Sequence, residues 1–200
     1  MRNKIINSLL ALGALFLLLT ACQNIKKTQL VLFESLSFNM SLKSFEEVFG
    51  EASEVEEEEE MAYRDTWRAE DPYFYKTGRL FYDYENIALN GYTGRARFTF
   101  SKSHRLEEAT AHIPVASKGE QYVVLNNLSQ TIKKEIEALP NFQSVTTETV
   151  GLYDDGYRYK VKLKGQSREF WIDVYPTEDE DAKEIEDKKY TIRVDQFRMH

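Results

Sequence analysis

The sequence predicts an α+β fold in which helices pack on one face of an antiparallel β-meander. Two segments carry apolar residues at helical spacing, and each is followed by several segments in which apolar and polar residues alternate. With 200 residues, the chain is long enough to bury a substantial core. We expect the apolar positions of the strands to face the helices and the polar positions to face outward.

Two helices are predicted from apolar spacing and end signals. The first begins near Ser41, a possible N-cap, has apolar residues at 42, 45, 48 and 49, and stops at Gly50. The second follows the capping-box pattern of Ser117 and Glu120, and its apolar residues recur at intervals of three and four until Pro140. Each helix therefore has one face to bury.

The strands of the first half are predicted from alternation over residues 61–68, 78–89, 94–100 and 106–113. Asn90-Gly91 is a strong signal for a tight hairpin turn between two of them. The five consecutive glutamates Glu56 to Glu60 indicate a solvated loop rather than a cation site.

A second set of strands is predicted over residues 142–150, 157–163, 170–174 and 190–194, and the acidic residues 178–187 are expected to form a solvated loop or a short surface helix. The helix-then-strands order thus occurs twice, over residues 38–114 and 115–200. This order predicts two similar helix-plus-meander halves, which form either one continuous sheet or separate ones. No clear repeat of residues accompanies this order.

The N-terminus has the pattern of a secretory signal over residues 1–21. Arg2 and Lys4 precede an almost uninterrupted apolar stretch at residues 5–19, which is too short to span a bilayer, since a span needs ~20 residues. Leu19-Thr20-Ala21-Cys22 resembles the lipobox of bacterial lipoproteins. The resemblance implies cleavage before Cys22, diacylglycerol on its thiol and membrane anchoring through the acyl chains, palmitate among them. An ordinary secretory signal with an incidental cysteine, or an uncleaved anchor, is the alternative.

Residues 22–37 are then expected to form a lipidated tether, within which residues 30–33 either pack on the domain as a strand or lie near the membrane. The predicted location is the cell envelope, outside the cytoplasm. Gln23 after the cysteine resembles the sorting pattern for the outer membrane of a Gram-negative cell; in a Gram-positive cell the outer face of the plasma membrane is expected.

The segment 94–110 carries a second resemblance. Gly94-Arg95-Ala96-Arg97-Phe98-Thr99-Phe100 followed by Arg105-Leu106-Glu107-Glu108-Ala109-Thr110 looks like the helix-plus-meander unit of β-lactamase inhibitor protein-like folds, which small lipoproteins of the outer-membrane barrel assembly machinery share. The likeness covers residues 38–113, although Gly50-Glu51-Ala52 lacks the Gly-x-Pro often found there. It implies protein binding through an exposed sheet face rather than catalysis, and it assigns no functional residue.

Motifs for catalysis, metals and cofactors are missing from the sequence: there is no nucleophile elbow, zinc helix or phosphate-binding glycine loop, and the histidines His104, His112 and His200 are too scattered to form a metal cluster. We therefore predict no catalytic residue, no metal site and no cofactor.

Two candidate binding features remain. A basic stripe, Arg158, Lys160, Lys162 and Lys164, places four cations on one sheet face, where an anionic lipid, a glycan or an acidic partner could dock. The alternative is cross-strand pairing with Glu169, Asp173 and Asp195. The aromatic residues Tyr73, Phe74 and Tyr75 are predicted to lie in a recognition loop, because Tyr is enriched at binding hot spots.

The sequence favours a membrane-anchored, non-enzymatic lipoprotein that binds or scaffolds another envelope protein. The alternatives are an envelope enzyme or its accessory subunit, with a site between the halves, and a protective inhibitor at the cell surface. The formal net charge of −7 argues against a general nucleic-acid binder.

Overall fold

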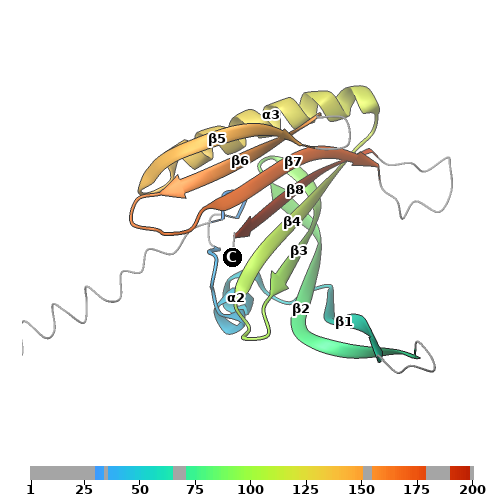
Figure 1. Cartoon of the computed structure of the whole chain (residues 1–200). Coiled ribbons are helices and arrows are strands. Elements are labelled where there is room, and N and C mark those ends of the chain that lie inside the picture. Colours follow the sequence, from blue (N-terminus) through green and yellow to red (C-terminus); the bar gives the residue numbers. More distant parts are fainter. Residues whose placement is uncertain (1–29, 34–35, 65–70, 151–154, 179–189, 199–200) are drawn as a thin grey trace, which may run out of the picture.

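The computed structural model describes residues 30–33, 36–64, 71–150, 155–178 and 190–198, with only the backbone described at 61–64, 71–73 and 178 (Figure 1). It confirms the α+β class and the antiparallel sheet. The described elements are α2 (Leu42–Phe49), β1 (Glu54–Arg64), β2 (Asp71–Leu89), β3 (Tyr92–Phe100), β4 (Leu106–Val115), α3 (Lys118–Ala138), β5 (Phe142–Val150), β6 (Gly156–Leu163), β7 (Phe170–Glu178) and β8 (Tyr190–Arg198).

All eight strands belong to one antiparallel sheet in the order β1-β2-β3-β4-β8-β7-β6-β5. Strands β4 and β8 meet in the middle, where their pairing runs from Glu108 opposite Phe197 to Val115 opposite Tyr190. Strands from before and after α3 therefore share a single sheet, which the sequence had left open. Strands β1 and β5 are its two edges, and Figure 1 shows β1–β4 and β5–β8 on either side of the β4–β8 junction.

Helix α3 covers one face of the β5–β8 part of the sheet (Figure 1). Its apolar side is fully buried, as the spacing predicted, and the sheet residues against it lie at alternate strand positions. The helix begins at Ser117, whose Oγ accepts a hydrogen bond from the Glu120 amide at 3.2 Å. Glu120 in turn accepts from the Ala116 amide at 2.8 Å, so the pair caps the helix end as the sequence predicted.

Helix α2 buries Phe45 against the inner side chains of β2 and β3. The Phe45 ring lies 4.9 Å from that of Phe98 and 5.0 Å from that of Phe100, and it is 0% exposed. Edge-to-face aromatic contacts of this kind add to the gain from burial. The helix stops at Gly50, whose φ of 85° favours glycine and whose amide donates to the Glu46 carbonyl at 3.0 Å.

Residues 30–33 and 36–38 pack on this same face, which we call the inner face. Residues 30–33 are buried, and the Val31 amide donates to the side-chain oxygen of Gln196 at 2.9 Å. Phe33 packs on Phe98 at 4.9 Å, and Phe38 packs on Phe170 at 5.9 Å. Residues 30–33 thus pack in the core, without forming a strand, and the expected tether is correspondingly shorter at its C-terminal end.

The hairpin turn at Asn90-Gly91 forms as predicted. Both residues have positive φ angles, 49° and 87°. This is the combination that a type I′ turn requires, and its twist matches that of the flanking strands β2 and β3.

The prediction of a solvated loop at Glu56–Glu60 was wrong, because these residues lie in β1. Their charges are offset by basic residues of β2: Lys76 lies 2.9 Å from Glu57, and Arg79 lies 2.9 Å from Glu58. A highly charged strand suits the edge of a sheet, where it discourages pairing with other chains. Of the acidic residues 178–187, only Glu178 is described, as the last residue of β7.

Candidate functional site

The face of the sheet opposite the helices, called the outer face here, carries polar residues from edge to edge. On β4, for example, Ala109, Ala111 and Ile113 are buried against the inner core, so the alternating residues Thr110 and His112 face outward. One row of directly opposed residues crosses all eight strands, and we call it the central row: Glu54, Asp83, Arg97, Thr110, Asp195, Asp173, Arg158 and Glu148. No described helix lies over it.

Two carboxylates stand side by side in the middle of the central row. Asp173 of β7 is directly opposite Asp195 of β8, and their side chains are only 9% and 10% exposed. Like charges in such a position repel each other. Arg158 offsets the repulsion by donating Nε and Nη2 to the two oxygens of Asp173 at 2.7 and 2.5 Å, the bidentate geometry in which guanidinium–carboxylate pairs are strongest.

The Asp195 carboxylate is held by three donors. It accepts hydrogen bonds from Thr110 Oγ1 at 2.7 Å, Tyr175 OH at 2.8 Å and Arg193 Nε at 3.0 Å. Burial, followed by the charge of Asp195, raises the pKa of Tyr175 well above its usual value. Burial and then Asp195 also raise the pKa of Glu108. The centre of the outer face is therefore a fixed hydrogen-bonded network whose side chains are already ordered.

An aromatic platform lies beside this network. The Trp171 ring of β7 packs on Phe197 of β8 with ring centres 5.8 Å apart. The Arg158 guanidinium lies 4.6 Å and the Lys160 ammonium 4.9 Å from the Trp171 ring centre, within the range of cation–π attraction. Trp171 Nε1 is buried and has no hydrogen-bond partner among the described residues. We call Trp171, Phe197, Arg158 and Lys160 the Trp171 platform.

The basic stripe divides into two parts. Arg158, Lys160 and Lys162 lie in β6, whereas Lys164 follows the strand in a turn. Arg158 pairs with Asp173, as the cross-strand alternative predicted, but Lys160 pairs with Glu148 of β5 at 2.6 Å instead of with one of the three expected acids. Lys162 and Lys164 are exposed. A docking role for the stripe remains a prediction and now involves mainly its outer two lysines.

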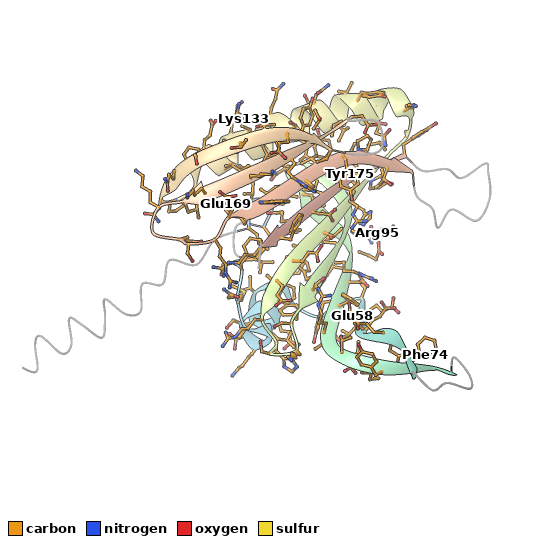
Figure 2. The ribbon with its side chains drawn as sticks, in the orientation of Figure 1. Glu58, Phe74, Arg95, Lys133, Glu169 and Tyr175 are labelled. Atoms are coloured by element: carbon orange, nitrogen blue, oxygen red, sulfur yellow. The ribbon has the colours of Figure 1, made fainter. Side chains whose placement is uncertain are left out.

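The prediction of a recognition loop at Tyr73–Tyr75 was wrong about its conformation, because the three residues belong to β2 and pair with β1. The pairing of the long hairpin continues through this segment and overrides the turn signal of its Asp-Pro sequence. Phe74 is nevertheless 66% exposed, near the far end of the hairpin in Figure 2. Tyr75 is 43% exposed and donates to Glu60 at 2.5 Å.

A hollow of about 380 Å³ opens on the outer face over β1, β2, β3, β4 and β8. One wall carries the carboxylates of β1 and β2, Glu54, Asp83 and Glu85, and the other carries Arg95, His112 and Arg193. Arg97 also lines the hollow. Figure 2 shows Arg95 at the same end of the sheet as Tyr175, in agreement with the register of the strands.

Several of these outer-face residues were not singled out by sequence reasoning. Alternation in β7 does place Trp171 and Tyr175 on the face away from the apolar residues of that strand, so the sequence predicts their side of the sheet. The sequence does not predict which residues of β6 and β8 lie next to them, because the register between strands distant in sequence is set by tertiary pairing.

Comparisons with known proteins found no protein-family model, curated protein or solved structure that matches the chain. Within the described residues, no group of three or more potential metal ligands is found. No described helix is long and apolar enough to cross a membrane. Cys22 lies outside the described residues.

Proposed function

We propose that the chain is an extracytoplasmic lipoprotein, anchored through Cys22, that binds another cell-envelope protein through the outer face of its sheet without catalysing a reaction. The observation that supports this most is that no described helix covers that face, although its side chains are held in place by hydrogen bonds and ion pairs. The two described helices and the buried residues 30–33 and 36–38 pack on the inner face, yet the outer face has its own ion pairs and hydrogen bonds. An ordered surface loses little conformational entropy when a partner binds.

The Trp171 platform is the proposed centre of the interface. Trp, Tyr and Arg dominate binding hot spots, and here Trp171 is held between Phe197 and two cations. The exposed Lys162 lies on the neighbouring strand and favours an acidic partner.

We also propose that the chain consists of two similar halves. Each contains one described helix followed by four strands, and the halves join through their last strands, β4 and β8. This arrangement supports the resemblance of residues 38–113 to the units of β-lactamase inhibitor protein-like folds, and a second copy over the remaining residues.

Crosslinking from the outer face tests the binding role. A photo-crosslinking residue at position 162 of the full chain is expected to capture an envelope protein in intact cells. Capture should be lost in Trp171→Ala and kept in Tyr122→Ala, which alters an exposed aromatic residue on α3 of the opposite layer. Capture that survives Trp171→Ala, or that both variants abolish equally, would contradict the proposed interface.

The lipid anchor has a separate test. A palmitate analogue supplied to growing cells should label the wild-type chain and leave Cys22→Ser unlabelled. Equal labelling of both would exclude attachment at this thiol.

A second candidate, a protective inhibitor at the cell surface, is favoured by one observation: the exposure of Phe74 near the end of the β1–β2 hairpin. An inhibitor of this kind would insert the hairpin into its target. In that case Phe74→Ser should abolish capture while Trp171→Ala leaves it unchanged, the reverse of the pattern expected for the outer face.

A further inference from the structure

The hollow on the outer face has separated charges that the protein-binding role does not explain. Its basic wall consists of three side chains on adjacent strands, since Arg95 of β3 is opposite His112 of β4, and His112 is opposite Arg193 of β8. Adjacent strands lie ~4.8 Å apart, so the two guanidinium-bearing positions flank a gap of two strand spacings with the imidazole between them. Long arginine side chains can converge on one ligand across such a gap.

Arg193 is held in a fixed orientation, but not all of its hydrogen-bond donors are used. Its Nε atom donates to Asp195 at 3.0 Å, and its guanidinium lies 5.9 Å from the Tyr175 ring centre. These contacts fix the plane of the group, while the described residues give its two terminal nitrogens no hydrogen-bond acceptor. A fixed guanidinium edge is the geometry that recognises a carboxylate with two parallel hydrogen bonds.

The opposite wall is acidic. Asp83 is occupied, because Arg97 donates Nε and Nη2 to its two oxygens at 2.8 and 2.6 Å. The other two carboxylates, Glu54 and Glu85, are exposed at the hollow. A simple anion attracted to the basic wall would therefore face two negative charges across the hollow, whereas a ligand with an additional cation would be complementary to both walls.

We propose that this hollow binds a zwitterionic ligand of the amino-acid or short-peptide class. The carboxylate of the ligand lies against Arg95, His112 and Arg193, and its ammonium group lies against Glu54 and Glu85. The volume of about 380 Å³ falls in the lower part of the range for small-molecule sites, ~300–1,000 Å³, and accommodates a molecule of dipeptide size. This site is distinct from the Trp171 platform and goes beyond the proposed protein-binding function.

Titration calorimetry with matched probes tests the charge pattern directly. The probes are alanylalanine, its N-acetyl derivative, which lacks the ammonium group, its C-terminal amide, which lacks the carboxylate, and inorganic phosphate. Alanylalanine should bind, and loss of either charge should weaken binding by about tenfold or more. The N-acetyl and amide probes also represent the two ends of a longer polypeptide, so tight binding of either would identify a chain end as the ligand and overturn the zwitterion proposal.

Variants assign each charge to its wall. Arg193→Gln should weaken alanylalanine binding, and in this variant the C-terminal amide should bind little worse than alanylalanine itself. Glu85→Gln should also weaken alanylalanine binding, and in that variant the N-acetyl derivative should bind little worse than alanylalanine. Arg95→Gln serves as a second variant of the basic wall, because Arg193 also supports Asp195. Lys162→Gln and Trp171→Ala, outside the hollow, should bind alanylalanine like the wild type.

Three results would overturn the proposal. The first is no binding of alanylalanine at about 10 mM, a concentration at which dissociation constants of ~1 mM and somewhat above are still detected. The others are phosphate binding as tight as dipeptide binding, and unchanged affinity for alanylalanine in both arginine variants. Because Trp171→Ala leaves this site intact, failure here and failure of the protein-binding interface are distinguishable.

Discussion

Arg158 should be a strong determinant of stability even though it lies on the outer face. Replacing it with Met in Arg158→Met keeps a long apolar stem over Trp171 but removes the two hydrogen bonds to Asp173 at 2.7 and 2.5 Å. The variant would leave Asp173, 9% exposed, without its cation and directly opposite Asp195. The loss follows from that stranded charge rather than from lost packing.

The expected magnitude is about 3 kcal/mol. Breaking a buried ion pair by removing one partner costs ~3–5 kcal/mol, and the 28% exposure of the Arg158 side chain places this pair at the lower end of that range because water screens it. With a urea m-value of ~2 kcal/mol/M, the unfolding midpoint should fall by about 1.5 M. Such a loss is a large fraction of the ~5–15 kcal/mol that stabilises a typical domain.

Urea unfolding at pH 7, followed by circular dichroism, measures the effect. Lys162→Met, an exposed position four residues away on the outward side of the same strand, is the matched control and should change stability by less than ~0.5 kcal/mol. Adding Asp173→Asn to Arg158→Met removes the stranded charge and should recover about half of the loss. The reasoning is refuted if Arg158→Met is as stable as the control, or if the double variant is no more stable than the single one.

Three further predictions concern the core, the backbone and pH. Phe45→Ala should lower the free energy of unfolding by ~3–5 kcal/mol, since Phe45 is 0% exposed among aromatic rings, and a loss below about 1 kcal/mol in urea unfolding would contradict that packing. Gly94→Ala should destabilise, because the new Cβ would lie 2.2 Å from the His112 carbonyl oxygen, whereas Gly119→Ala in the first turn of α3 meets nothing closer than 3.9 Å and should stabilise by ~0.5–1 kcal/mol; equal melting temperatures would refute the contrast. Glu108 has a pKa raised above 4.5, so its contribution to stability is fully present below that value and is lost as the pH rises through the folded-state pKa; Glu108→Gln should therefore be more stable than the wild type at pH 7, with the difference disappearing below about pH 4.

Local sequence signals were sufficient for both described helices and for the main hairpin turn. The caps at Ser41 and Ser117 form because each side-chain oxygen meets the amide three residues later, and the turn at Asn90-Gly91 forms because both residues accept positive φ. All these interactions lie within a few residues, so the sequence order alone brings the groups together.

The two errors share one physical cause. Glu56–Glu60 and Tyr73–Tyr75 each carry a loop-like composition, but both lie in the β1–β2 hairpin, where Glu60 is opposite Tyr75 and where backbone pairing and ion pairs such as Glu58 with Arg79 stabilise extended structure. β-propensity depends on the neighbouring strand more than on the segment itself. The composition of one segment does not show which strand it will pair with, so these two segments were predicted as loops.

The order of apolar and polar residues specifies which side of each strand faces the core, because burial follows the two-residue period of a strand. It also determined the residues available to the outer face. Which of these residues meet depends on strand pairing: Thr110 reaches Asp195 across 85 positions in the chain, and Asp173 lies opposite Asp195 because β7 and β8 pair in one register. A shift of one residue would turn the outward side chains of a strand toward the core, so the charged network, the Trp171 platform and the polar hollow all depend on the register in which the eight strands pair.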